Sequence, residues 1–157
     1  MNQHLKAALA CLALGSVAAT ACKSLGTPAD QSQADILWSA MTDYDTWGNF
    51  DGHEGIMKGK SPHGPYVRTF VNSVGMQDQA NPGYGTIIVK ENFSRDDAST
   101  LKGITVMERI EGYDDENNDW FWARYTPTGE QTHNGMVPFC SDCHFDAGND
   151  DFVFLND

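Results

Sequence analysis

The chain has 157 residues, of which 40% are hydrophobic, 11% aromatic and 20% charged. This composition suits one compact domain and excludes a chain that is mainly disordered. Asp and Glu number 22 against 10 Lys and Arg, which gives a net charge of -12. Because the basic residues are scattered singly, the chain has no cluster to follow a phosphate backbone, and we expect no binding of nucleic acid.

The first apolar segment has the features of an export signal. Residues 1–6 carry one Lys and no acid, and residues 7–19 are almost all small or apolar. This run is shorter than a membrane span and ends in Ala19-Thr20-Ala21, a small-x-small pattern that signal peptidases cleave. We predict a signal peptide over residues 1–21 and a single domain over residues 22–157, located in the periplasm or otherwise exported.

Cys22 leaves a second possibility open. It follows the predicted cleavage site directly, where bacterial lipoproteins carry their lipid, although Ala19 stands where such signals usually have Leu. A lipid on Cys22 would tether the domain to a membrane without altering its fold. The sequence leaves both a soluble exported protein and a lipoprotein as alternatives.

One helix is predicted after this segment, followed by a long loop. Thr27 and Pro28 have the chemistry of an N-cap and a first helical residue, and apolar residues then recur at helical spacing, which predicts a helix over residues 28–42. Residues 47–65 contain five glycines and two prolines. This composition predicts a loop with tight turns, and loops of this length are often functional.

The pattern then changes to β-structure. Four segments are rich in β-branched and aromatic residues and are separated by turn-forming residues, which predicts an antiparallel meander. They are residues 66–72, 85–93, 103–113 and 119–126. We therefore predict an α+β fold that is mainly antiparallel β-sheet, with an N-terminal helix and a separate C-terminal segment.

The C-terminal segment carries the strongest motif in the chain. Three cysteines remain after Cys11 leaves with the signal, an odd number that argues against a disulfide framework. Cys140 and Cys143 stand in a C-x-x-C-H motif that ends at His144. The spacing lets both thiols bond one edge of a porphyrin and leaves the imidazole beneath the iron. We predict one covalent haem c, bound by Cys140 and Cys143, with His144 as the iron ligand. Residues 22–157 are therefore predicted to form a single haem-binding domain with a C-terminal haem-attachment segment.

Other readings of the motif find less support. A thioredoxin-like C-x-x-C would open a helix in an α/β pattern, which the sequence lacks. A structural zinc site needs four ligands, and neither a second Cys pair nor an H-x-x-x-H follows. Electron-carrier cytochromes c place the motif early and supply a Met downstream, whereas residues 145–157 contain neither Met nor His. We therefore expect an open or weakly occupied sixth position on the iron.

The chain resembles the cytochrome P-460 family, which includes the β-sheet cytochromes c′-beta. The four-helix cytochromes c′ also carry the motif near the C-terminus, but they need four helical patterns and this chain offers one. The resemblance rests on seven segments in the same order: Trp47-Gly48-Asn49-Phe50, Ser61-Pro62-His63-Gly64, Tyr66-Val67-Arg68-Thr69-Phe70-Val71-Asn72, Val89-Lys90-Glu91-Asn92, Gly112-Tyr113, Asp119-Trp120-Phe121-Trp122 and Cys140 to His144. It covers nearly all of the predicted mature chain and implies a homodimer.

The resemblance also implies roles for individual side chains. In the hydroxylamine-oxidising members a strand Lys is bonded to a haem meso carbon, and the matching residue is Lys90; its alternative role is that of an edge residue that reaches water. Arg68 matches the family's Arg on the open side of the iron, where a cation would steady a bound anion; the alternative is an Arg paired with a carboxylate. Phe70 and Phe93, with Phe121, match an apolar cap over the haem or are ordinary core residues.

The sequence departs from the hydroxylamine oxidisers just before the haem motif. Residues 132–137 supply His133 and Asn134 but no carboxylate to accept protons, and Glu91 is on the opposite strand face from Lys90. His133 is a candidate base, and His53 and His63 are candidate relays or iron ligands, or else residues of turns and of the surface.

Three functions follow from these expectations. The first is an open-site haem protein that binds nitric oxide or related small nitrogen ligands. The second is an oxidoreductase that converts hydroxylamine or nitric oxide, with Lys90 linked to the haem and with Arg68 and His133 as catalytic residues. The third is an electron carrier with a six-coordinate iron, whose acidic surface docks on a redox partner protein.

Overall fold

The structure is a computed structural model that describes residues 23–146 and residue 153. The predicted signal peptide and Cys22 lie outside the described residues. Within the described part of the chain, no helix is long and apolar enough to span a membrane.

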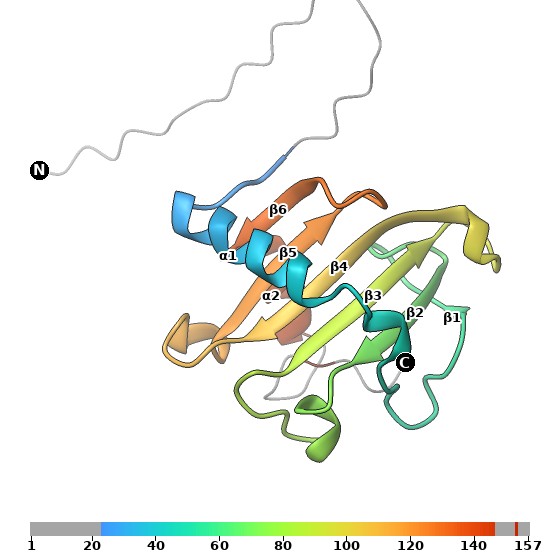
Figure 1. The fold of residues 1–157 in the computed structure, drawn as a ribbon, viewed down its shortest axis with the longest axis horizontal. Helices are drawn as coiled ribbons and strands as arrows, with labels where there is room; N and C mark the ends of the chain where they lie inside the picture. The colour runs from blue at the N-terminus through green and yellow to red at the C-terminus, as the bar shows by residue number, and fades with distance from the viewer. Residues whose placement is uncertain (1–22, 147–152, 154–157) are drawn as a thin grey trace, which may run out of the picture.

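A six-stranded antiparallel sheet forms the centre of the molecule, with the strands in sequence order (Figure 1). Each strand pairs with the next, as predicted for a meander. The strands are β1 (Met57–Lys58), β2 (Tyr66–Val71), β3 (Ile87–Phe93), β4 (Leu101–Arg109), β5 (Trp120–Tyr125) and β6 (Gln131–Gly135). With two helices added, the fold is α+β and mainly β-sheet, which confirms the predicted fold class.

Helix α1 (Pro28–Ala40) begins where the sequence predicts it. The Thr27 hydroxyl accepts from the Asp30 backbone N–H, and the Asp30 carboxylate accepts from the Thr27 N–H, which completes a capping box. Tyr113 donates to the same carboxylate at 2.8 Å and so ties the first turn of α1 to the loop after β4. Leu37 is buried against the sheet.

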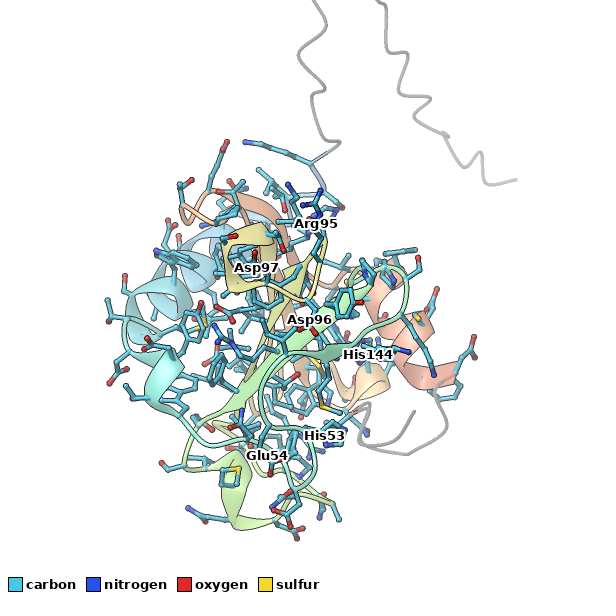
Figure 2. All side chains as sticks on the ribbon, turned by 90° about the vertical axis from the view of Figure 1, so that its right-hand side faces the viewer. His53, Glu54, Arg95, Asp96, Asp97 and His144 are labelled. Atoms are coloured by element: carbon cyan, nitrogen blue, oxygen red, sulfur yellow. The ribbon has the colours of Figure 1, made fainter. Side chains whose placement is uncertain are left out.

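The two helices cover opposite faces of the sheet. Figure 1 shows α1 across the near face and α2 (Pro138–Asp146) behind the sheet, and the edge-on view of Figure 2 shows the sheet between them. Because side chains alternate along a strand, each strand contributes to two separate cores. Val89 and Val106 pack on the α1 side, whereas Ile88 and Trp122 pack on the α2 side. We call these two surfaces the α1 face and the α2 face.

Among the strands and α-helices of the described residues, three were not predicted from the sequence. They are the two-residue β1, β6 and the helical form of α2. Strand β6 pairs with β5, and its outer edge is covered in part by Ser24, which exchanges backbone hydrogen bonds with Thr132 and Asn134. The sheet therefore extends to the chain segment that precedes α1.

Candidate functional site

Helix α2 holds the whole C-x-x-C-H motif against the sheet. The His144 side chain faces the sheet and is only 6% exposed (Figure 2), whereas Cys143 on the outer side of the helix is exposed. Cys140 is half-buried and packs against the core of the α2 face. Neither cysteine is in a disulfide. One short helix thus presents an imidazole inward and two free thiols beside it.

A row of polar side chains, which we call the polar row, crosses the sheet on the α2 face. Five residues that pair in register across β2 to β6 share the α2 face: Thr69, Lys90, Thr105, Arg124 and His133. Two of them are cations, two are hydroxyls and one is an imidazole, so the row contains no carboxylate. Such a row favours an anionic or polarised ligand on this side of the sheet.

Two aromatic rings lie next to His144. The Trp122 ring centroid is 4.7 Å away, which is a packing contact, and the His63 ring centroid is 6.0 Å away with the two imidazole planes at 84°. The indole N–H of Trp122 is buried and has no hydrogen-bond acceptor among the described residues. A buried Trp N–H normally has a partner, so this donor is available to a group that is not part of the chain.

His63 enters the site from the loop between β1 and β2. Its Nδ1 lies 3.2 Å from the Thr105 hydroxyl. Burial lowers the pKa of His63 to about 3, with further lowering by the charges of Lys90 and His144. The resulting imidazole is neutral at ordinary pH. The sequence left two roles open for His63, that of a relay or iron ligand and that of a turn residue. In the structure His63 lies in a turn, and its ring lies next to the ring of His144.

Arg124 influences several of these groups. Burial lowers the pKa of His133, and the Arg124 charge lowers it further. Burial raises the pKa of Cys140 to about 11, with a smaller opposing effect of Arg124. Arg124 was not singled out from the sequence, and the register of β5 with β4 and β6 is what reveals it.

The structure does not bring Arg68, Phe70 and Phe93 to His144. All three lie on the α1 face, on the other side of the sheet from Lys90 and α2. Arg68 pairs with the buried carboxylate of Glu91 at 2.6 Å, and its guanidinium lies 5.2 Å and 5.7 Å from the ring centroids of Phe70 and Phe93. This placement matches the alternative of an ion-paired Arg with core aromatics. Because side chains alternate between the two faces along β2 and β3, Arg68 and Glu91 lie on the opposite face from Lys90.

The remaining candidates divide in the same way. Phe121 packs in the α1-face core. Lys90 and His133 lie in the polar row, three strands apart. His53 lies in the loop before β1 and contacts the backbone oxygen of Asp51 at 3.1 Å, lower in Figure 2 than His144. The donors that gather around α2 are therefore His63, Lys90, Arg124 and His144.

Two surface depressions lie away from the polar row. One, of about 680 Å³, lies beside the end of α1 and includes Trp47 and Met76 in its lining. The other, of about 600 Å³, lies between α2 and the turn after β4 and is lined in part by acidic residues. Neither is lined by His63 or Lys90. The donor chemistry on the α2 face identifies the candidate site.

Comparison with known proteins gives one family. The sequence model of the family described as Cytochrome P460 matches residues 43–155. The matched range includes the loop that carries His63, the whole sheet and α2. A search of the curated proteins found no match.

The residues of the α2 face fit a haem. Two thiols and an imidazole on one helix are the donors that a haem c needs, and the unpaired Trp122 N–H beside His144 lacks an acceptor that a bound group would supply. Because the family match covers most of the chain, haem is the cofactor of this protein.

Proposed function

The chain belongs to the cytochrome P460 family and is a haem-binding cytochrome, and from this premise we propose its particular role. The protein is an exported cytochrome with a single covalent haem c. Cys140 and Cys143 form the thioether bonds, His144 ligates the iron, and the opposite side of the iron binds nitric oxide or a related small nitrogen ligand.

One observation carries the proposal. The imidazole of His144, the two free thiols and the polar row of Lys90, Thr105 and Arg124 lie on the same face of the sheet. The haem supplies an iron that binds small diatomic and nitrogen-oxide ligands. The chain supplies the imidazole of His144, which packs against Trp122 and would ligate the iron, and cationic groups that would steady negative charge on a bound ligand.

Haem attachment is tested first. The full chain is expressed with a haem-maturation system, and the purified protein is analysed by intact mass and by the pyridine haemochrome spectrum. We expect one haem per chain, lost in the double variant Cys140→Ala/Cys143→Ala and retained in the matched control Cys22→Ser. A wild-type protein that matures without covalent haem would refute the proposal.

Ligand binding is tested on the same material. The reduced protein is titrated with nitric oxide without oxygen, and binding is followed in the visible spectrum and by electron paramagnetic resonance. We expect saturable binding at one site per haem. Arg124→Gln is expected to weaken retention of anionic ligands such as nitrite by roughly tenfold, because one cation of the row is removed. Lys102→Gln, which removes an exposed charge from β4, is the matched control.

A second candidate function has its own observation. Lys90 lies on the α2 face, where it pairs in register with Thr105, whose hydroxyl contacts His63. This supports an oxidoreductase for hydroxylamine or nitric oxide in which Lys90 is bonded to the haem. Peptide mapping after proteolysis would find a haem peptide that contains both Lys90 and Cys140. If Lys90 is recovered unmodified, this candidate is rejected.

Other expectations accompany the proposal as predictions. An exported chain requires cleavage after Ala21, and a lipid on Cys22 would anchor it to a membrane. A homodimer is implied by the family resemblance, and the acidic composition would suit a basic redox partner. The mass of the mature chain tests cleavage after Ala21 and the lipid on Cys22. Its sedimentation coefficient tests the homodimer.

A further inference from the structure

We propose that hydrogen peroxide, reacting at the haem, oxidises Tyr84 at the protein surface by way of Trp122 and Trp120, and that the oxidised Tyr84 then oxidises small phenols. This is a second activity, a peroxidase reaction at a site away from the iron. It rests on the proposed ligation of the haem by His144 and goes beyond the binding of nitric oxide.

The route begins at the ring that packs on His144. The Trp122 indole is 3% exposed, and its centroid lies 4.7 Å from the centroid of the imidazole, with the two planes at 65°. Indole and phenol are the aromatic side chains that lose one electron most easily. Because Trp122 contacts the imidazole that holds the iron, it is the first side chain on this route from which the haem can draw an electron.

Trp120 continues the route along β5. It stands two residues before Trp122, so both side chains lie on the same face of the sheet, about 7 Å apart along the strand. Both belong to the core of the α2 face, and Trp120 is fully buried. An electron can therefore pass from one indole to the other inside the protein, away from water.

Arg109 connects Trp120 with a surface tyrosine. The guanidinium carbon of Arg109 lies 5.8 Å from the centroid of the Trp120 ring and 5.5 Å from the centroid of the Tyr84 ring. Tyr84 belongs to the loop before β3 and is 51% exposed. The two rings thus contact one guanidinium, and the second ring is open to molecules in solution.

Charge decides where the oxidation comes to rest. An indole that has lost an electron is positively charged, and the neighbouring cation of Arg109 disfavours that charge on Trp120. A phenol gives up its proton together with the electron, so its radical is neutral. The Tyr84 hydroxyl donates to the Asp119 carboxylate at 3.0 Å, which is an acceptor already in place for this proton. Tyr84 is therefore the stable site of oxidation.

The electrons and atoms of the reaction balance. Hydrogen peroxide takes up two electrons and two protons and leaves as two molecules of water. Each oxidation of Tyr84 supplies one electron through the two indoles and one proton through Asp119. A small phenol then gives one hydrogen atom to the Tyr84 radical, which restores the tyrosine and releases a phenoxyl radical. One molecule of peroxide thus oxidises Tyr84 twice and consumes two phenols.

The first experiment locates the radical. The haem protein is mixed with an equal amount of hydrogen peroxide, frozen and studied by electron paramagnetic resonance. Tyr84→Phe is compared with wild type and with the matched control Tyr66→Phe, which changes a partly exposed tyrosine of β2. We expect a tyrosyl signal in wild type and Tyr66→Phe that narrows when the tyrosine rings are deuterated, and loss of this signal in Tyr84→Phe. Absence of the signal from wild type, or its persistence in Tyr84→Phe, overturns the proposal.

The second experiment tests the route. Trp120→Phe removes an indole, and Asp119→Asn removes the proton acceptor at a position where the positive φ of 63° suits Asn. Both variants keep Tyr84, and both should lose the tyrosyl signal. A full signal in either variant overturns the assigned route, and Asp119→Asn supplies this test if Trp120→Phe folds poorly.

Oxidation of guaiacol, a small phenol, tests the activity. With hydrogen peroxide present, the visible absorbance of the product should appear in wild type and Tyr66→Phe and should be lost in Tyr84→Phe. Oxidation at the wild-type rate in Tyr84→Phe would mean that phenols react at the haem itself, and it overturns the surface site.

The nitric oxide titration separates this inference from the proposed function. Tyr84→Phe should bind haem and nitric oxide as wild type does, because Tyr84 lies outside the haem site. Normal nitric oxide binding without a Tyr84 radical overturns the inference and leaves the proposed function intact. A Tyr84 radical in a haem protein that does not bind nitric oxide supports the inference and refutes the ligand-binding function. A wild-type chain without haem at Cys140 and Cys143 refutes both.

Discussion

Arg68 and Glu91 form an ion pair on the face that does not carry the site. Glu91 is 5% exposed and accepts hydrogen bonds from Arg68 at 2.6 Å and from the Tyr44 hydroxyl at 2.8 Å. Removal of one partner of a buried pair leaves the other charge without compensation, which costs about 3–5 kcal/mol when both are fully buried. Because Arg68 is partly exposed, a smaller loss is expected here.

We predict that Arg68→Ala lowers the free energy of unfolding by about 2 kcal/mol and leaves the haem spectrum unchanged. Urea unfolding followed by tryptophan fluorescence gives the first quantity, and the visible spectrum of the folded protein gives the second. The double variant Arg68→Ala/Glu91→Gln should recover part of the lost stability, since no unpaired carboxylate is left. A changed Soret band in Arg68→Ala would instead place this residue at the haem, as the family resemblance implies.

The two thiols of the motif differ in reactivity for a physical reason. Cys143 is exposed, whereas burial raises the pKa of Cys140 to about 11. Alkylation requires the thiolate, so the buried thiol reacts more slowly. In chain produced without haem, we predict that iodoacetamide modifies Cys143 at least about tenfold faster than Cys140, as measured by peptide mass spectrometry over time. In matured protein neither thiol should be alkylated, and equal rates in the haem-free chain would show that α2 does not dock on the sheet.

At the scale of elements, the start of α1 depends on one carboxylate. Burial alone would raise the pKa of Asp30, but hydrogen bonds from Tyr113 and Thr27 outweigh it and hold the pKa below the usual 3.8. A carboxyl whose pKa is lowered by folding stabilises the protein above its unfolded pKa, and this contribution is lost as the pH falls through the folded pKa.

We predict that Asp30→Asn destabilises the protein by about 1 kcal/mol at pH 7 and that the difference from wild type shrinks below pH 4. Unfolding midpoints measured in urea from pH 3 to pH 7 provide the test. Thr27→Ala, which removes the other half of the capping box, should cost a similar amount at pH 7. A difference that grows on acidification would contradict the role of the ionised carboxylate.

The sequence predicted those elements whose own residues carry the signal. The helix at Pro28–Ala40 has its cap and its periodic apolar residues, and the four central strands are rich in β-branched and aromatic residues. Strand β6, with the sequence Gln-Thr-His-Asn-Gly, has no such pattern. It is a strand because β5 offers an open edge, and a partner of that kind is not visible in the local sequence.

The same limit applies to the site. The C-x-x-C-H motif predicts Cys140, Cys143 and His144 because its chemistry depends on spacing alone. Arg124 and Thr105 escaped prediction because only strand register brings them to α2. Arg68 was assigned to the haem site by matching one strand segment to the family. Side chains alternate between the two faces along a strand, so neighbours such as Arg68 and Thr69 point to opposite sides of the sheet.

The whole molecule is a sheet with two independent cores. Helix α1 and the core beneath it do not include α2 or His144. Loss of the haem should therefore weaken one face and leave the other packed. We predict that Cys140→Ala/Cys143→Ala, produced without bound haem, keeps the far-ultraviolet circular dichroism of a β-sheet protein and unfolds cooperatively at a lower temperature than the haem protein. A haem-free chain without cooperative unfolding would show that the two cores depend on each other.

The place of α2 in the chain bears on the timing of maturation. All six strands precede Pro138–Asp146, so the sheet can assemble before the attachment motif has found its position. Once α2 docks, the Cys140 side chain packs in the α2-face core. A maturation enzyme that must reach this sulfur therefore competes with the last step of folding. Variants that slow docking of α2 should raise the yield of haem protein in the cell, and variants that speed docking should release more chain without haem.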